Sequence, residues 1–165
     1  MNIGVISDTH GVFDERIKEF LAPVDQIWHA GDFGGGMDLA RDIAAFKPLI
    51  GVAGNCDNQA LRFDHPLHQC WECEGMKILM THIGGYPGRY DLKAYGLIEA
   101  YRPDIFVCGH SHILKVVRDP MKNDMLVINP GAAGIQGFHI VRTALRFKIE
   151  DGKIHSMEVF ELERD

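Results

Sequence analysis

Short apolar runs, each followed by polar residues, recur along the first third of the chain. Three of these runs predict buried strands, over residues 2–6, 26–30 and 49–52. Apolar side chains at helical spacing predict two intervening helices, over residues 13–21 and 38–46. In the second helix, Ala40, Ile43 and Ala44 are expected to face the core. Strand and helix units in succession imply parallel strands joined by right-handed crossovers.

The rest of the chain adds hairpins and one more helix. Two β-rich arms, residues 69–72 and 77–80, flank the turn pair Glu74-Gly75 and predict a hairpin. A helical core stripe is formed by Ala94, Leu97, Ile98 and Tyr101. Further strands are expected over residues 105–108, 113–118, 125–129, 144–150 and 154–162. We therefore predict one domain over residues 1–165 with an α/β fold, a four-layer α/β/β/α sandwich of two mixed β-sheets flanked by helices.

Side chains that can bind metals follow five of the predicted strands. They are Asp8, His10, Asp32, Asn55, His82, His110 and His112. The carboxyl ends of parallel strands meet at one edge of a sheet, so these side chains are expected to converge. Carboxylate, imidazole and carboxamide groups hold divalent transition ions, and two ions about 3.5–4 Å apart can clamp both oxygens of a phosphoryl transfer. The set predicts a two-metal site.

Each position also has a simpler interpretation. Asp8 can cap a helix, Asn55 can be a left-handed turn residue, and His82 can cap a strand. These interpretations would all have to hold together at five strand ends, so the metal site is favoured. His29 is expected to be buried and structural or to support a ligand. Surface positions are expected for His65, His68, His139 and His155.

Composition narrows the classes of partner. Seventeen basic and twenty-three acidic residues give a formal net charge of −6, which disfavours duplex nucleic acid and leaves a small anionic substrate. No apolar run approaches the roughly 18 residues of a membrane span, and residues 1–7 lack the basic start of a signal peptide. We therefore expect no membrane association and a cytoplasmic location.

The four cysteines are expected to be free thiols. Cys70-Trp71-Glu72-Cys73 has the CxxC spacing, but the chain offers no second cysteine pair. Chance occurrence in a strand is favoured over a zinc or redox site.

The motifs D-x-H, G-D, G-N-x-[DE], T-H and G-H-x-H, in this order, resemble those of the calcineurin-like metallophosphoesterases. The resemblance is greatest to the small bacterial and archaeal phosphodiesterases. It implies one ion held by Asp8, His10, Asp32 and His112, and a second held by Asp32, Asn55, His82 and His110. By the same resemblance Asp32 bridges the ions, and a hydroxide shared by them attacks phosphorus in line. Manganese is the first expectation for both ions, with iron, zinc, cobalt and nickel as alternatives.

Two segments depart from the family pattern. Larger phosphatases of the superfamily carry a histidine, thought to be the general acid, where this chain has Cys56. Cysteine is a poor substitute for imidazole near neutral pH, so good leaving groups are expected to be favoured. Cys56 and the adjacent Asp57 are nevertheless the candidate catalytic residues. The second departure is the segment over residues 83–90, where the family pattern has a glycine. Arg89 and the two tyrosines of this segment are expected either to bind the substrate or to cover the start of the next helix.

The resemblance allows two classes of function. The first is a phosphodiesterase or phosphatase that acts on a small phosphate ester. The second is a protein-binding scaffold with residual metal binding, because the retromer subunit that shares this fold mainly holds partner proteins. A scaffold has no reason to keep every ligand, and all seven positions here carry competent donors. The enzyme is therefore favoured; a homo-oligomer is compatible with either class.

Overall fold

The computed structural model describes residues 1–164 and contains two five-stranded β-sheets. The first sheet, in the order β10-β9-β1-β2-β3, consists of β1 (Asn2–Ile6), β2 (Gln26–His29), β3 (Leu49–Gly51), β9 (Val141–Glu150) and β10 (Lys153–Glu163). The second, in the order β4-β5-β6-β8-β7, consists of β4 (His68–Cys73), β5 (Met76–Thr81), β6 (Ile105–Val107), β7 (Leu114–Asp119) and β8 (Met125–Pro130). The helices are α1 (Glu15–Leu21), α2 (Gly36–Phe46), α3 (Gln59–Asp64), α4 (Leu92–Tyr101) and the 3₁₀ turn η1 (Pro120–Lys122).

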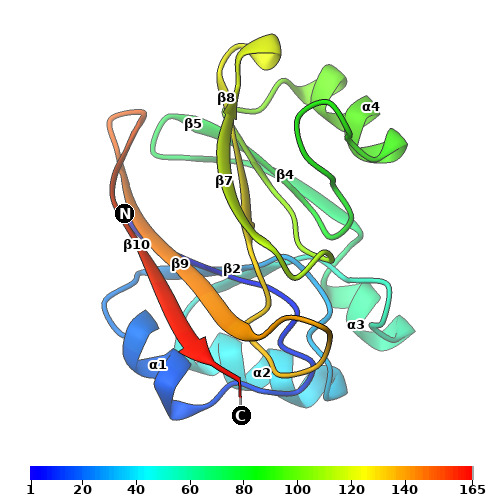
Figure 1. The fold of residues 1–165 in the computed structure, drawn as a ribbon, viewed down its shortest axis with the longest axis vertical. Helices are drawn as coiled ribbons and strands as arrows, with labels where there is room; N and C mark the ends of the chain where they lie inside the picture. The colour runs from blue at the N-terminus through cyan, green and yellow to red at the C-terminus, as the bar shows by residue number, and fades with distance from the viewer. Residues whose placement is uncertain (165) are drawn as a thin grey trace.

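The structure has four layers, and an apolar cluster fills each of the three interfaces between them, as the predicted sandwich requires. Ile3 and Val5 of β1 point toward the second sheet, where they belong to the same buried cluster as Ile78 of β5. Ile6 points to the opposite side, where α1, α2 and α3 cover the first sheet. The outer face of the second sheet is covered by α4, which buries Ile98. Figure 1 shows α4 on the opposite side of the molecule from α1 and α2. The predicted fold class is confirmed.

Both sheets contain the parallel strands that bring the candidate ligands to one edge. β1 pairs in parallel with β2, and β2 with β3. In the second sheet β5, β6 and β8 run parallel. The loops after β1, β2, β3, β5 and β6 carry all the candidate ligands. The hairpins β4–β5, β7–β8 and β9–β10 are antiparallel, as predicted.

Two details of the prediction were wrong. The sequence pattern did not predict α3, a six-residue helix with a single buried residue, Leu61. Ala44 is exposed, because the buried face of α2 consists of Leu39, Ala40 and Ile43.

The predicted strand position of the CxxC segment is correct. Cys70 and Cys73 lie three residues apart on β4, one exposed and one buried, so their thiols point to opposite faces. Within residues 1–164 all the cysteines are free. No helix among these residues is long and apolar enough to cross a membrane.

Candidate metal centre

Hydrogen bonds between the loops hold the candidate site together. The backbone N–H of Asp8 donates to Gly31 O at 2.9 Å, and that of His10 donates to Asp32 O at 3.1 Å. The N–H of His110 donates to Oδ2 of Asp8 at 3.0 Å and so connects the two sheets. These hydrogen bonds therefore fix the positions of the loops relative to each other.

The backbone of the ligand loops is unusually constrained. Positive φ angles occur at Asp8, His10, Asp32, His110 and His112. Such angles are uncommon outside glycine, cost free energy and cluster at functional sites. Asn55 is not among the positive-φ residues, so the left-handed turn interpretation does not apply to it. Neighbouring glycines permit close approach: a Cβ atom on Gly54 would lie 2.1 Å from Oδ1 of Asp32, and one on Gly109 would lie 2.8 Å from Oδ2 of Asp8.

The candidate ligands form two adjacent groups. In each group, the ligand atoms lie within 4.8 Å of one another: one group is Asp8, His10 and His112, and the other is Asp32, His82 and His110. Asn55 adjoins the second group, with Oδ1 3.1 Å from Nδ1 of His110. The structure thus brings all seven predicted ligands together.

Asp8 has one oxygen in use and one free. Its Oδ2 accepts hydrogen bonds from the Ser7 hydroxyl at 2.6 Å and from the His110 N–H. Its Oδ1 is buried without a hydrogen-bond partner and lies 3.2 Å from Nε2 of His112. A buried carboxylate oxygen that is oriented but unpaired is costly unless a cation binds it.

Asp32 lies between the two groups. Its Oδ2 is 3.7 Å from Nε2 of His10 and 3.2 Å from Nε2 of His82. Its Oδ1 accepts a hydrogen bond from the Cys56 N–H at 2.8 Å, which fixes the orientation of the carboxylate. Burial opposes ionisation, but hydrogen bonding to His82 and the charge of that ring outweigh it and lower the pKa of Asp32 to about 2. Asp32 is therefore anionic near neutral pH.

The His82 ring has only one possible neutral tautomer at this position. Its Nδ1 lies 2.7 Å from the Ala30 carbonyl, which can only accept, so Nδ1 carries the hydrogen. The buried Nε2 then has a lone pair directed at Oδ2 of Asp32, and no hydrogen-bond partner compensates it. Two facing lone pairs require a cation between them. That cation is a proton or a metal ion; although burial opposes the charged ring, Asp32 and Asp8 raise the pKa of His82.

The two candidate catalytic residues occupy different environments. Cys56 is exposed beside Asn55, and partial loss of solvation together with the nearby Asp32 carboxylate raises the pKa of its thiol. The carboxylate of Asp57 is buried and accepts backbone N–H bonds from Asp32 at 2.9 Å, Gly54 at 2.8 Å and Gly34 at 3.4 Å. Asp57 therefore connects the loops after β2 and β3.

His29 is fully buried, as expected, and it supports the ligand loops. Its Nδ1 accepts the Gly31 N–H at 3.0 Å, and its Nε2 lies 3.0 Å from the Thr9 hydroxyl. Its ring stacks on Phe33 at 3.6 Å between centroids. Burial lowers the pKa of His29 to about 3.

The surface expectation for the other histidines holds for His68 and His155 and is wrong for two others. His65 is half-buried and stacks on Phe33. His139 lies beside the candidate metal ligands, with its Nδ1 3.2 Å from Nδ1 of His112. Nothing in its sequence context, a glycine-rich segment between strands, signals that contact.

Two grooves adjoin the candidate metal centre and meet at Ile83 and Asp91. The first, the Arg62 groove, has a volume of about 600 Å³ and is lined by residues that include Asn55, Arg62, Leu67, His82, Leu92 and Lys93. The second, the Tyr86 groove, has a volume of about 510 Å³ and is lined by residues that include Tyr86, Arg89, His110, Ser111, Lys115 and Asn129.

Residues 83–90 place their side chains in two different environments. Tyr90 is structural, since its hydroxyl donates to Asp119 at 2.6 Å. Tyr86 and Arg89 are exposed and line the Tyr86 groove, where the Lys115 ammonium lies 4.3 Å from the Tyr86 ring centroid.

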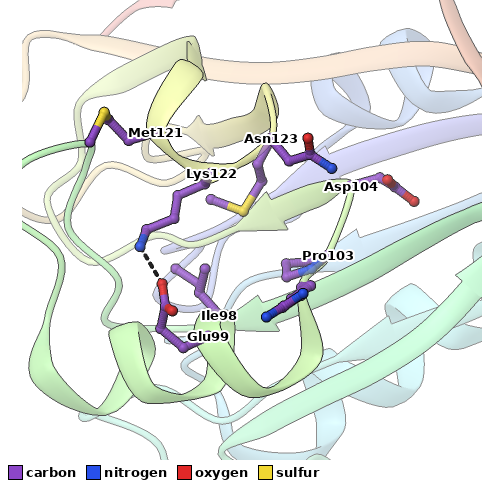
Figure 2. A pocket seen from close by; sticks show the side chains of 9 residues that line it. Ile98, Glu99, Pro103, Asp104, Met121, Lys122 and Asn123 are labelled. Atoms are coloured by element: carbon purple, nitrogen blue, oxygen red, sulfur yellow. Dashed lines mark hydrogen bonds and ion pairs between the residues drawn. The ribbon is translucent and has the colours of Figure 1, made fainter.

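A further hollow of about 410 Å³ lies elsewhere, between the end of α4 and η1 (Figure 2). Lys122 and Glu99 form an ion pair across it. None of the candidate ligands lines this hollow, so it is separate from the metal centre.

Comparisons with known proteins agree with this fold. Vps29 from Entamoeba histolytica in complex with Zn²⁺ has a TM-score of 0.74 at 17% identity, with 99% of each chain covered. A Streptococcus pneumoniae protein described as a predicted phosphoesterase has a TM-score of 0.65 at 21% identity, covering 99% of this chain and 97% of that one. Vps29 from Chaetomium thermophilum bound to a cyclic peptide has a TM-score of 0.68 at 16% identity, covering 98% and 95%.

At these identities the structural matches show the fold alone. No curated protein sequence matches the chain. The family model for the calcineurin-like phosphoesterase superfamily domain matches residues 1–152, nearly the whole length. The resemblance inferred from the motifs is confirmed, and the chain belongs to the calcineurin-like phosphoesterase superfamily.

Proposed function

We propose that this protein is a metal-dependent phosphodiesterase with two divalent ions at the candidate metal centre. The observation that carries the proposal is the pair of buried, unpartnered ligand atoms, Oδ1 of Asp8 and Nε2 of His82, at the centre of the two ligand groups. Both atoms carry lone pairs, and both lie in the part of the site where ions would be held. The donors fit divalent ions, because carboxylate, imidazole and amide oxygen suit manganese, iron, zinc and cobalt.

The proposed ligand sets follow the two groups. Asp8, His10, Asp32 and His112 would hold one ion, and Asp32, Asn55, His82 and His110 the other. Bound ions of this kind supply Lewis acidity, which activates water as a nucleophile near neutral pH and neutralises charge on phosphoryl oxygens. The position of Asp32 Oδ2, near both His10 and His82, supports its proposed bridging role.

The remaining polar residues position this set. Ser7 orients Asp8, and Cys56 orients Asp32 through its backbone N–H. Asp57 is proposed as a positioning residue and not as a proton carrier, because backbone N–H groups occupy its carboxylate. Asn55 adds a neutral ligand oxygen, which does not repel an incoming phosphate.

The two grooves support a diester as the substrate. A phosphodiester has two organic groups on one phosphorus, and the two grooves beside the candidate metal centre share the lining residues Ile83 and Asp91. Arg62 and Lys93 line one groove and Arg89 and Lys115 the other, so cations outnumber the single lining carboxylate. This local positive charge overrides the net charge of −6 for a small anion. Arg89 is thus proposed as a substrate-binding residue.

No imidazole is available to protonate the leaving group at the position of Cys56. The raised pKa of the thiol keeps it protonated near neutral pH, but a thiol is a far weaker acid than imidazolium. The enzyme should therefore depend on leaving-group quality, and aryl esters should react faster than alkyl esters.

The experiment compares bis(p-nitrophenyl) phosphate with p-nitrophenyl phosphate after reconstitution of metal-free protein with manganese. The diester should have the higher kcat/KM. Arg89→Glu and Arg62→Glu should raise KM for the diester, whereas Lys153→Glu, at the far edge of the first sheet from the ligand loops, should not. Equal or better hydrolysis of alkyl monoesters would contradict the proposal.

The alternative function is a protein-binding scaffold. It is supported by the fold shared with Vps29. The Chaetomium thermophilum Vps29 structure contains a bound cyclic peptide. Occupancy of all seven ligand positions by metal-binding residues favours the enzyme. Two ions bound per chain with no turnover of any phosphate ester would favour the scaffold.

A further inference from the structure

His139 is the histidine whose position the sequence did not reveal. It lies in the segment between β8 and β9 and contacts His112, a proposed metal ligand, edge to face at 5.0 Å between ring centroids. Its Nδ1 is 3.2 Å from Nδ1 of His112, and its Nε2 is 2.8 Å from the Gly134 carbonyl oxygen. Gly134, His139 and His112 thus form a continuous chain of hydrogen bonds.

The hydrogens in this chain can be assigned from chemistry. A carbonyl oxygen only accepts, so Nε2 of neutral His139 carries the hydrogen and its Nδ1 carries the lone pair. Nδ1 of His112 must then donate to His139. The consequence is that in neutral His112 the Nε2 atom, which lies 3.2 Å from Oδ1 of Asp8, carries no hydrogen and can bind a metal ion.

The segment that carries His139 is itself fixed. The Arg164 guanidinium donates to Ile135 O at 2.9 Å and to Gly137 O at 2.5 Å. The Gly134 N–H donates to Asp8 O at 3.2 Å, which connects the segment to the loop of another ligand. Gly137 has a φ of +126°, and a Cβ atom there would lie 2.4 Å from Nδ1 of His112. The backbone therefore passes close to His112 at a residue without a side chain.

We propose that His139 is a positioning residue that holds His112 in the tautomer required of a metal ligand. The proposal rests on the proposed function only in taking His112 as a ligand. Without an acceptor at Nδ1, His112 is free to carry its hydrogen on Nε2, where the hydrogen blocks the ion. Hydrogen bonds that set the orientation and tautomer of a ligating histidine typically change metal affinity 10–100-fold.

Two substitutions separate this role from packing. His139→Phe keeps a planar ring but removes the acceptor. His139→Gln offers an amide oxygen to Nδ1 of His112 and an amide N–H to the Gly134 carbonyl. His155→Phe, at an exposed histidine on β10, is the matched control.

Titration of metal-free protein with Co²⁺ by calorimetry measures the effect without any substrate. Wild type and His155→Phe should bind two ions. His139→Phe should bind one of the two about 10–100-fold more weakly, and His139→Gln should recover most of that loss. Unchanged affinity for both ions in His139→Phe would overturn the proposal.

A second measurement needs no metal. Long-range ¹H–¹⁵N correlation spectra of metal-free wild type at pH 8 should show a hydrogen on Nδ1 of His112 and a hydrogen on Nε2 of His139. A His112 ring without a hydrogen on Nδ1 would also overturn the proposal. If these results hold but no phosphate ester is hydrolysed, the proposed function fails while the role of His139 stands.

Discussion

Oδ2 of Asp32 lies 3.2 Å from Nε2 of His82, and the Ala30 carbonyl at the other ring nitrogen leaves that Nε2 atom without a hydrogen when the ring is neutral. The two residues come from loops after strands in different sheets, and each is only 3% exposed. A contact between a buried carboxylate and a buried lone pair is favourable only with a cation between them. The fold therefore places a cation site, for a proton or a metal ion, between the two sheets.

Replacement of Asp32 by asparagine should abolish turnover. Oδ1 of the asparagine can still accept the Cys56 N–H bond, so the loop should keep its structure. The anionic oxygen between His10 and His82 is lost. Substitution of a residue that only supports a metal ligand typically lowers metal affinity or activity by about 10–100-fold. Because Asp32 is itself a proposed ligand, kcat/KM for an aryl diester should fall by more than about 100-fold. Circular dichroism melts that match wild type would show that the fold is intact, and a variant that retains activity would disprove the bridging role.

Replacement of Cys56 by histidine should add a general acid. If Cys56 lies near the leaving oxygen, the new imidazole should speed hydrolysis of poor leaving groups by about 10²–10⁴-fold. Aryl esters need little protonation and should change far less. The measurement is the ratio of alkyl to aryl diester hydrolysis at constant metal content. An unchanged ratio would place leaving-group protonation on water or on another residue.

Replacement of Gly54 by alanine should displace Asp32. The added Cβ atom would lie 2.1 Å from Oδ1 of Asp32 and 2.4 Å from its backbone nitrogen, which cannot move away easily. We expect weaker metal binding and a lower melting temperature. Gly96→Ala is the control: Gly96 lies in α4 with open space around it, and alanine there should stabilise the protein by about 0.5–1 kcal/mol. Equal effects of the two substitutions would rule out a steric role for Gly54.

His29 should make the metal-free protein less stable in acid. Burial lowers its pKa from 6.5 to about 3, so between these values the unfolded chain binds a proton that the folded protein does not. The stabilising contribution is complete above pH 6.5 and falls as the pH drops toward 3, by roughly 1.4 kcal/mol per pH unit. Urea unfolding at pH 7 and pH 5 should show a smaller loss of stability in His29→Gln than in wild type. A loss of the same size in both proteins would contradict the assigned pKa shift.

Strand ends and ligand motifs were predictable from sequence because both depend on local patterns. β1, β2 and β6 are short apolar runs, and each delivers its ligands within a few residues of its end. The helix α3 was not predictable from periodicity, since it spans six residues and buries only Leu61. Its one local signal is Asn58, whose side chain accepts the Leu61 N–H at 3.0 Å as an N-cap.

Roles that depend on tertiary contacts were not predictable. His139 contacts His112 from a segment that Arg164 holds by hydrogen bonds and that passes close to His112 at Gly137. Asp57 looked like a candidate catalytic carboxylate, and only the folded loops reveal that backbone N–H groups occupy it. Both cases require knowledge of where a loop closes, which the residue pattern does not contain.

The two-ion phosphodiesterase mechanism is tested most directly by the rate of bis(p-nitrophenyl) phosphate hydrolysis as manganese is added to metal-free protein. We expect no turnover without metal and a rate that reaches its maximum at two ions per chain. Full activity in the presence of a chelator, saturation at one ion per chain, or no turnover with two ions bound would contradict it.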